Sequence, residues 1–219
     1  VPKSFFKTDW PMMIFATLLF IVMIASDQIL SSFEGFIMIL ILFGFIFYLL
    51  NKNGQNELIE PASAEFKVLN KKQTFIYLFA GGFALWLGSE TLVKGAVSLA
   101  TLMEVSERVI SVSIISIGTS IPELSASIVA IIRKEKAISL GNLIGSNVFN
   151  ILAVMGVTSM ILPVKVQDLD LISNDLVWMF VISMLVLLMV FIPRDSRLNR
   201  FNGIVLLGLY IYFIYGLIG

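Results

Sequence analysis

Seven long apolar stretches, separated by shorter polar segments, constrain the fold of this chain more than any other feature. They lie at about 10–26, 34–50, 74–101, 109–132, 138–162, 174–193 and 201–218. A helix needs roughly 20 apolar residues to cross the hydrocarbon core of a bilayer. The strands of a membrane β-barrel would alternate apolar and polar residues, and these stretches do not. The sequence therefore predicts an all-α polytopic membrane protein with about seven transmembrane helices.

The composition limits the chemistry that the chain can perform. Of its 219 residues, 58% are hydrophobic, 14% are charged, and none is histidine or cysteine. This excludes disulfides, haem ligation and zinc sites built on these side chains. Any metal ion must be held by oxygen atoms, which favours hard cations such as calcium, sodium or magnesium. The formal net charge is zero, so no nucleic-acid partner is indicated. The partners that we expect are the lipid bilayer and small cations.

Basic residues are distributed unevenly between the two sides that seven spans create. Arg108 and Lys165 fall on one side, and Lys94 lies inside a span. The other side carries Lys3, Lys7, Lys52, Lys67, Lys71, Lys72, Arg133, Lys134, Lys136, Arg194, Arg197 and Arg200. The positive-inside rule makes this second side cytoplasmic. We therefore expect a multi-pass protein of the cell membrane, with a cytoplasmic linker (51–73) and an extracytoplasmic C-terminus.

The second and seventh spans are similar in sequence. Each opens Phe-x-Gly, at Phe33 and Phe201, and continues with aliphatic and aromatic residues. Residues 1–50 then correspond to the last two helices of 74–219, and the three helices between have no counterpart. The pattern predicts a ten-helix protein of two inverted five-helix repeats, of which the first three helices are absent here. A complete seven-helix protein is the alternative.

The fourth span carries a polar face. Helical spacing puts five polar side chains on one side: Ser113, Ser116, Ser120, Glu123 and Ser127. An ionisable residue at membrane depth is costly and indicates a functional site by default. Pro122 has no amide proton, so the carbonyl oxygen of Gly118 loses its helical partner. We expect the hydroxyl, carboxylate and backbone oxygens of this face to form a cluster of hard donors that suits a desolvated cation.

The fifth span repeats this theme in "GNLIGSNVFN". Asn142, Ser146 and Asn150 follow each other at intervals of four and share one helix face. Gly141 and Gly145 allow another helix to approach closely. Taken by itself this pattern is explained equally well by helix packing. Beside the face that carries Glu123, a contribution to cation binding becomes the better interpretation.

Three segments resemble a known family. They are "GTSIPELSAS" (118–127), "GNLIGSNVFNI" (141–151) and "LWLGSETLVKGA" (85–96). Together they resemble the second α-repeat, with its preceding helix, of the cation/calcium exchanger (sodium/calcium exchanger) superfamily. The resemblance covers all 219 residues, as the fourth to tenth helices of that fold. It implies an inverted-repeat antiporter in which 74–219 is the second repeat and 109–162 its ion-binding segment.

The resemblance also implies which residues hold the ions. The metal ligands that it predicts are Ser116, Thr119, Ser120, Glu123, Ser146 and Asn150. In this set Glu123 supplies a carboxylate and Ser116 a backbone carbonyl. Members of the family have either Asn or Asp at the position of Asn150, and here the residue is neutral. The transported ions would be calcium and either sodium or protons, with no separate cofactor.

The predicted ligand set contains a single carboxylate, whereas calcium binding favours two or more anionic ligands. Glu90 is the other acid well inside a span, and Lys94, one turn later, is expected to neutralise it as an ion pair. The second glutamate of the family lies on the first α-repeat, which this chain lacks. We therefore expect that the chain cannot carry out exchange alone. It would need the missing N-terminal α-repeat, from the same protein or from a second chain.

The sequence fits an antiporter better than it fits three other classes of protein. A passive cation channel is the alternative that the sequence does not exclude, because the same ligands could line a pore. A retinal-binding receptor would need a lysine in its last helix, and 201–218 contains no ionisable group. An intramembrane enzyme would need a histidine or paired intramembrane aspartates, so we predict no enzymatic activity.

Overall fold

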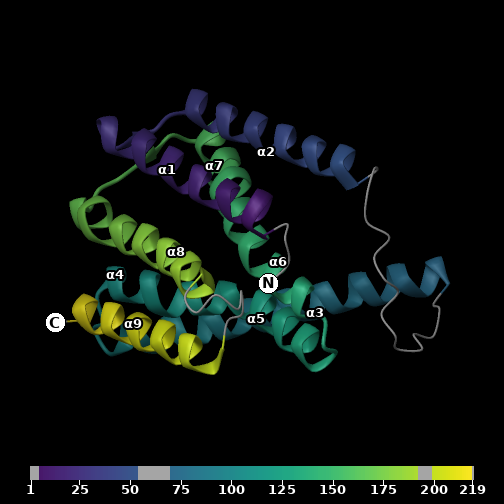
Figure 1. The fold of residues 1–219 in the computed structure, drawn as a ribbon. Coiled ribbons are helices and arrows are strands. Elements are labelled where there is room, and N and C mark those ends of the chain that lie inside the picture. Colours follow the sequence, from purple (N-terminus) through teal and green to yellow (C-terminus); the bar gives the residue numbers. More distant parts are fainter. Residues whose placement is uncertain (1–4, 54–69, 192–198, 219) are drawn as a thin grey trace. The chain divides into compact units, whose positions relative to one another are not determined.

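The computed structural model describes residues 5–53, 70–191 and 199–218, most of which are helical (Figure 1). Seven helices in these ranges are long and apolar enough to cross a membrane: Phe5–Asp27, Ser32–Lys52, Lys71–Leu102, Ile110–Ile132, Ser139–Ile161, Leu171–Val190 and Arg200–Leu217. They correspond one for one to the predicted spans, which confirms the all-α polytopic fold class. The predicted linker lies mostly outside the described residues, and its two ends are helical.

The chain separates into two compact units, and each is described by itself. The first unit contains residues 1–56 and 130–213, and the second contains residues 57–129 and 214–219. This division follows spatial contacts, whereas the predicted boundaries follow sequence repeats. The assignment of 1–50, 51–73 and 74–219 to repeats and linker stays a prediction.

The first unit begins with two helices joined by a tight turn. A π-helical segment η1 (Phe5–Asp9) leads into α1 (Trp10–Asp27), whose first turn contains Pro11, a position where no amide donor is needed. Helix α2 (Ser32–Asn53) starts with a capping arrangement around Ser31. The Glu34 carboxylate accepts hydrogen bonds from the Ser31 amide (2.8 Å) and hydroxyl (2.7 Å), which satisfies a donor at the start of the helix.

The fifth span is one long helix with a π-helical insertion. It consists of α6 (Lys136–Phe149), η3 (Asn150–Met155) and α7 (Gly156–Ile161). Helix α2 packs closely against α7, because Gly35 and Gly156 leave room for the two backbones. A Cβ atom added to Gly35 would lie 2.5 Å from the carbonyl oxygen of Gly156. Small residues of this kind allow the close approach that stabilises helix pairs in membranes.

Two short strands join the loops after α1 and α7. They are β1 (Ile29–Leu30) and β2 (Val164–Lys165), which pair antiparallel with Ile29 opposite Lys165. The Val166 amide extends the ladder by a 2.8 Å hydrogen bond to the carbonyl oxygen of Gln28. The all-α prediction did not include these strands. They place the two loops at the same end of the unit, as the predicted alternation of spans requires.

Helix α8 and the larger part of α9 complete the first unit. A π-helical segment η4 (Leu171–Asp175) precedes α8 (Leu176–Phe191), and α9 is Arg200–Ile218. The Trp10 indole donates a 3.1 Å hydrogen bond to the carbonyl oxygen of Ser183, which ties α1 to α8. The core of this unit is shared by η1, α1, β1, α2, the fifth span and α8, and it is built from Phe5, Met13, Ile14, Ala16, Phe20, Ile24, Leu30, Met38, Leu42, Ile144, Val148, Leu152, Ala153, Leu176 and Val190.

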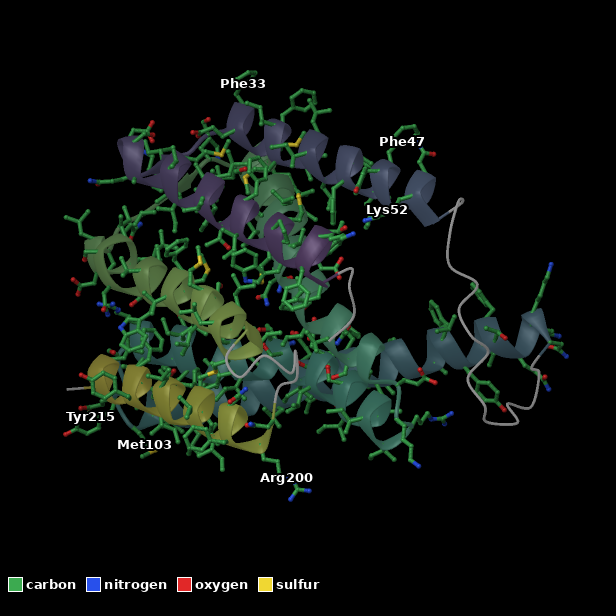
Figure 2. The ribbon with its side chains drawn as sticks, viewed as in Figure 1. Phe33, Phe47, Lys52, Met103, Arg200 and Tyr215 are labelled. Carbon is green, nitrogen blue, oxygen red and sulfur yellow. The ribbon has the colours of Figure 1, made fainter. Side chains whose placement is uncertain are left out.

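Large apolar side chains also cover the outside of this unit. Phe33 and Phe47 are 71% and 66% exposed, and both point away from the neighbouring helices (Figure 2). In water such a surface would drive aggregation. On a multi-pass membrane protein it is the surface that meets lipid, so the exposed apolar residues agree with the seven candidate spans.

The second unit holds the third span and most of the fourth. Helix α3 (Lys71–Leu102) is capped by Asn70, whose side chain accepts a 2.8 Å hydrogen bond from the Gln73 amide. A short helix α4 (Glu107–Val109) and a π-helical segment η2 (Ile110–Ile115) lead into α5 (Ser116–Ile132). Helix α3 packs against η2, and it contacts α5 through Ser89 and Val93. Its small residues Ser89 and Ala100 are buried.

Candidate functional site

The predicted oxygen face lies on α5, directly after a π-helical segment. Ser116 is the first residue of the helix and is exposed, as is Ser120, while Glu123 is half-buried. The 3.6-residue period behind the predicted face applies from Ser116 onward, because Ser113 lies within η2, where the winding is wider. The four site residues predicted for this span therefore lie within two turns of one helix.

The hydroxyl groups of Ser116 and Thr119 at the start of α5 donate their protons to the backbone. Thr119 Oγ1 lies 3.0 Å from the carbonyl oxygen of Ile115 and 3.2 Å from that of Ser116. Ser116 Oγ donates to the carbonyl oxygen of Ser111 at 3.1 Å, a five-residue step that the π-helical winding creates. A hydroxyl whose proton is held by the backbone keeps its oxygen lone pairs free for another partner. Oxygen atoms in this state suit a hard cation.

The carbonyl oxygen that Pro122 frees is engaged by a neighbouring helix. Pro122 lies inside α5, so the carbonyl oxygen of Gly118 has no amide partner four residues later. The hydroxyl of Ser89 on α3 donates a hydrogen bond to this oxygen. The sequence prediction that Pro122 frees a carbonyl is consistent with this contact. The sequence predicted that this carbonyl oxygen is free to bind a cation. One of its two lone pairs instead accepts the hydrogen bond from Ser89.

The remaining two predicted ligands lie on the fifth span. Ser146 is half-buried on α6, and its hydroxyl donates to the carbonyl oxygen of Leu143 at 3.1 Å. Asn150 is exposed and is the first residue of η3. These residues belong to the first unit, whereas the α5 ligands belong to the second. A joint site formed by both spans therefore stays a prediction.

Glu123 supplies the negative charge of the α5 face. Its Oε2 atom is buried. Within the described ranges no group of three or more His, Cys, Asp or Glu is placed to hold a metal ion. Glu90 forms an ion pair with Lys94, with Nζ and Oε1 3.0 Å apart, which confirms the predicted pairing one helical turn apart.

Comparison with known protein families identifies the kind of membrane protein that this geometry serves. The sequence model of the family described as "Sodium/calcium exchanger protein" matches residues 73–219. The chain belongs to the sodium/calcium exchanger family. The match contains every residue of the predicted ligand set, and it confirms the resemblance drawn from the three sequence segments.

Individual exchangers extend the similarity to the rest of the chain. The putative antiporter CaxA of Alkalimonas amylolytica is 35% identical over 217 residues, which cover 95% of this chain and 67% of CaxA. The sodium/calcium exchanger MaX1 of Methanosarcina acetivorans is 40% identical over 101 residues, or 46% of this chain and 29% of MaX1. The similarity to CaxA therefore includes the first two spans, which the family model does not match.

A solved exchanger structure has the same fold. The sodium-calcium exchanger NCX_Mj, soaked with sodium and strontium, superposes with a TM-score of 0.74 at 25% identity. The superposition covers 98% of this chain and 66% of the NCX_Mj chain. The 219-residue chain thus spans about two thirds of the length of CaxA and of NCX_Mj.

Sequence reasoning did not single out one polar residue that touches the site. Ser89 precedes Glu90 in an apolar span, and nothing in its local sequence distinguishes it from a packing serine. The sequence indicated only that some donor is needed, because Pro122 leaves a carbonyl oxygen at membrane depth without its amide partner. The sequence could not indicate which of the neighbouring hydroxyls supplies it.

Proposed function

We propose that this chain carries part of an antiporter that exchanges calcium for sodium or protons across the membrane by alternating access. The observation that carries the proposal is the oxygen face of α5, where Glu123 lies near hydroxyls whose protons are bound to the backbone. Membership of the sodium/calcium exchanger family supports the same assignment. Calcium and sodium are hard cations, and oxygen donors of this kind bind them.

The proposed ligands come from two spans. On α5 they are the carbonyl of Ser116, the hydroxyls of Thr119 and Ser120, and the carboxylate of Glu123. The fifth span would add the Ser146 hydroxyl and the amide oxygen of Asn150 once the two faces meet. Mixed carbonyl, hydroxyl and carboxylate oxygens replace the water shell of a cation without placing many uncompensated charges in the membrane.

This ligand set contains one carboxylate, which limits what the chain does alone. Calcium carries two positive charges, and its affinity in proteins rises with the number of anionic ligands. We propose that a second carboxylate comes from an N-terminal α-repeat, in the same protein or in a second chain. The share of CaxA and NCX_Mj that the chain spans, about two thirds, is consistent with this requirement.

The orientation proposed from the basic residues puts the linker in the cytoplasm and the C-terminus outside. Two contacts in the first unit are consistent with the alternation that this needs. The β1–β2 ladder joins loops assigned to the outer side. Lys52 donates a 2.6 Å hydrogen bond to the hydroxyl of Thr8, and both residues are assigned to the inner side.

The test is calcium flux in vesicles that contain the purified chain. Radioactive calcium uptake is measured with an outward sodium gradient, with a proton gradient and with neither. With an N-terminal α-repeat also present, an antiporter gives uptake that saturates and requires one of the gradients, and Glu123→Gln removes it; the chain alone should give no exchange. Uptake without any counter-ion gradient would support the passive channel instead. Robust exchange by the 219-residue chain alone would contradict the need for a second carboxylate.

A further inference from the structure

One hydrogen bond in the second unit differs from the others made by hydroxyls of the same helix. Three hydroxyls on α3, those of Thr91, Ser98 and Thr101, donate to carbonyl oxygens of their own helix four residues earlier, at 2.7–2.9 Å. Such self-bonding is the ordinary state of a hydroxyl in an apolar helix. Ser89 instead donates across to the carbonyl oxygen of Gly118 on α5.

The surroundings of this bond are closely packed. Ser89 is 9% exposed, and Gly118 is buried. A Cβ atom added to Gly118 would collide with the side chain of Val93, one turn along α3 from Ser89. Gly118 therefore allows α3 to approach the backbone of α5 closely, at the one turn where Pro122 has removed an amide donor.

The chemistry of the two partners is complementary. A carbonyl oxygen without a donor is strongly unfavourable in a membrane interior. Without a substitute donor, the turn at Pro122 would relax or admit water. The Ser89 hydroxyl supplies a donor from outside the helix. Gly118 is followed directly by Thr119 and Ser120, so the peptide that Ser89 holds leads into the proposed ligands.

We propose that Ser89 is a positioning residue for the cation site. Its hydroxyl takes the place of the amide that Pro122 lacks, and it fixes the peptide unit after Gly118 in the orientation that presents Thr119 and Ser120. Ser89 touches no ion itself. This role rests on the proposed cation-binding function of the α5 face, and it adds a residue of α3 to the determinants of that site.

A double-mutant cycle tests the replacement of the amide. The purified full chain in detergent is compared with Ser89→Ala, Pro122→Ala and the double variant. Thermal unfolding of each is followed by circular dichroism. Ser89→Ala should lower the Tm by about 3 °C, the effect of losing roughly one hydrogen bond. In the Pro122→Ala background residue 122 donates to Gly118 again, so the same substitution should have little effect. Equal losses in both backgrounds would overturn the proposal.

Calcium binding separates positioning from mere stability. Calcium chloride is titrated into each variant, and the apparent affinity is read from the rise in Tm, with Glu123→Gln as the variant that lacks the site. Ser89→Ala should weaken the affinity about five-fold, as one lost hydrogen bond implies, and the double variant should recover it. Ser89→Thr, which keeps a donor, should stay near the native affinity.

The outcomes distinguish the two proposals. If the native chain binds calcium and Ser89→Ala binds it equally well, the positioning role is wrong while the proposed function stands. If the native chain and Glu123→Gln both fail to respond to calcium, the claim that the α5 face binds calcium in this chain is wrong. The melting cycle alone then decides whether Ser89 replaces the missing amide.

Discussion

The hydroxyl of Ser32 on α2 donates a 3.0 Å hydrogen bond to the carbonyl oxygen of Ser159 on α7. This bond lies beside the contact between Gly35 and Gly156, so a polar link and a close backbone approach occur at the same crossing. Ser159 is fully buried, and its own hydroxyl donates to the carbonyl oxygen of Gly156 at 3.1 Å. The crossing is thus closely fitted and should tolerate no additional atoms.

Gly35→Ala should destabilise the chain. The new methyl group would meet the Ser159 hydroxyl and the carbonyl oxygen of Gly156, which lies 2.5 Å away, and the two helices would have to separate. Overpacking of this kind costs about 1–3 kcal/mol. Gly44→Ala is the matched control on α2, because nothing lies within 4 Å of its added Cβ. A lower Tm for the first variant alone is expected, and equal melting of both would contradict the close crossing.

Asn150→Asp should raise the affinity for calcium. The substitution places a carboxylate on the face of the fifth span, the second in the proposed ligand set after Glu123, and a further anionic ligand strengthens binding of a divalent cation by about ten-fold or more. The gain depends on that face meeting Glu123, so the experiment also tests the joint site. Asn70→Asp, at the exposed start of α3, adds the same charge and keeps a capping side chain. Calorimetric titration with calcium chloride should show a gain for the first variant only.

Glu104→Gly should stabilise the end of α3. Glu104 has a φ of 58°, in the left-handed region, and the next amide, of Val105, donates a 3.1 Å hydrogen bond to the carbonyl oxygen of Ala100. This is the Schellman pattern, in which glycine is preferred at the left-handed position. Glycine relieves the strain of the left-handed conformation but also gains freedom in the unfolded chain. The net increase in the free energy of unfolding should be about 0.5–1 kcal/mol.

The matched control for that variant lies one turn earlier. Thr101→Gly places glycine inside α3, where it should destabilise the helix by about 1 kcal/mol. Thermal melting should show a higher Tm for Glu104→Gly and a lower Tm for Thr101→Gly than for the native chain. If Glu104→Gly melts lower than the native chain, the left-handed conformation at residue 104 is not present in solution.

Leu30→Cys combined with Val164→Cys should form a disulfide under mild oxidation. These residues are paired opposite each other in the β1–β2 ladder, and the native chain contains no cysteine that could interfere. Directly opposed residues in an antiparallel pair have the Cα separation that a disulfide requires. Ile29→Cys with Val164→Cys is offset by one residue, so its side chains point to opposite faces of the ladder. Cross-linking of the offset pair at the same rate would contradict the register.

Apolar length predicted the membrane helices well, because a bilayer requires a minimum length and allows few charges. The stretch predicted at 109–132 is helical over Glu107–Ile132, and the one at 34–50 extends to Ser32–Asn53. The π-helical segments η2 and η3 were not predicted. Their winding depends on packing and on side-chain bonds such as that of Ser116, which periodicity alone does not reveal.

The candidate site was predictable in its chemistry and less so in its contacts. Glu123, Thr119 and the freed carbonyl of Gly118 followed from residue type and from the effect of Pro122 on a helix. The Ser89 donor could not be predicted, because a hydroxyl in an apolar helix can bond either to its own backbone or to a neighbour. Which bond it makes depends on how closely two neighbouring helices approach each other, and the local sequence does not determine this.

The β1–β2 ladder also sets an order of events during synthesis. Four spans separate Leu30 from its partner Val164 along the chain, so Leu30 is made well before the residue that it pairs with. Until then the backbone groups of the first loop must bond to water. The turn between α1 and α2 therefore stays unpaired until α7 is made, and α7 then both packs against Gly35 and brings the strand that closes that turn.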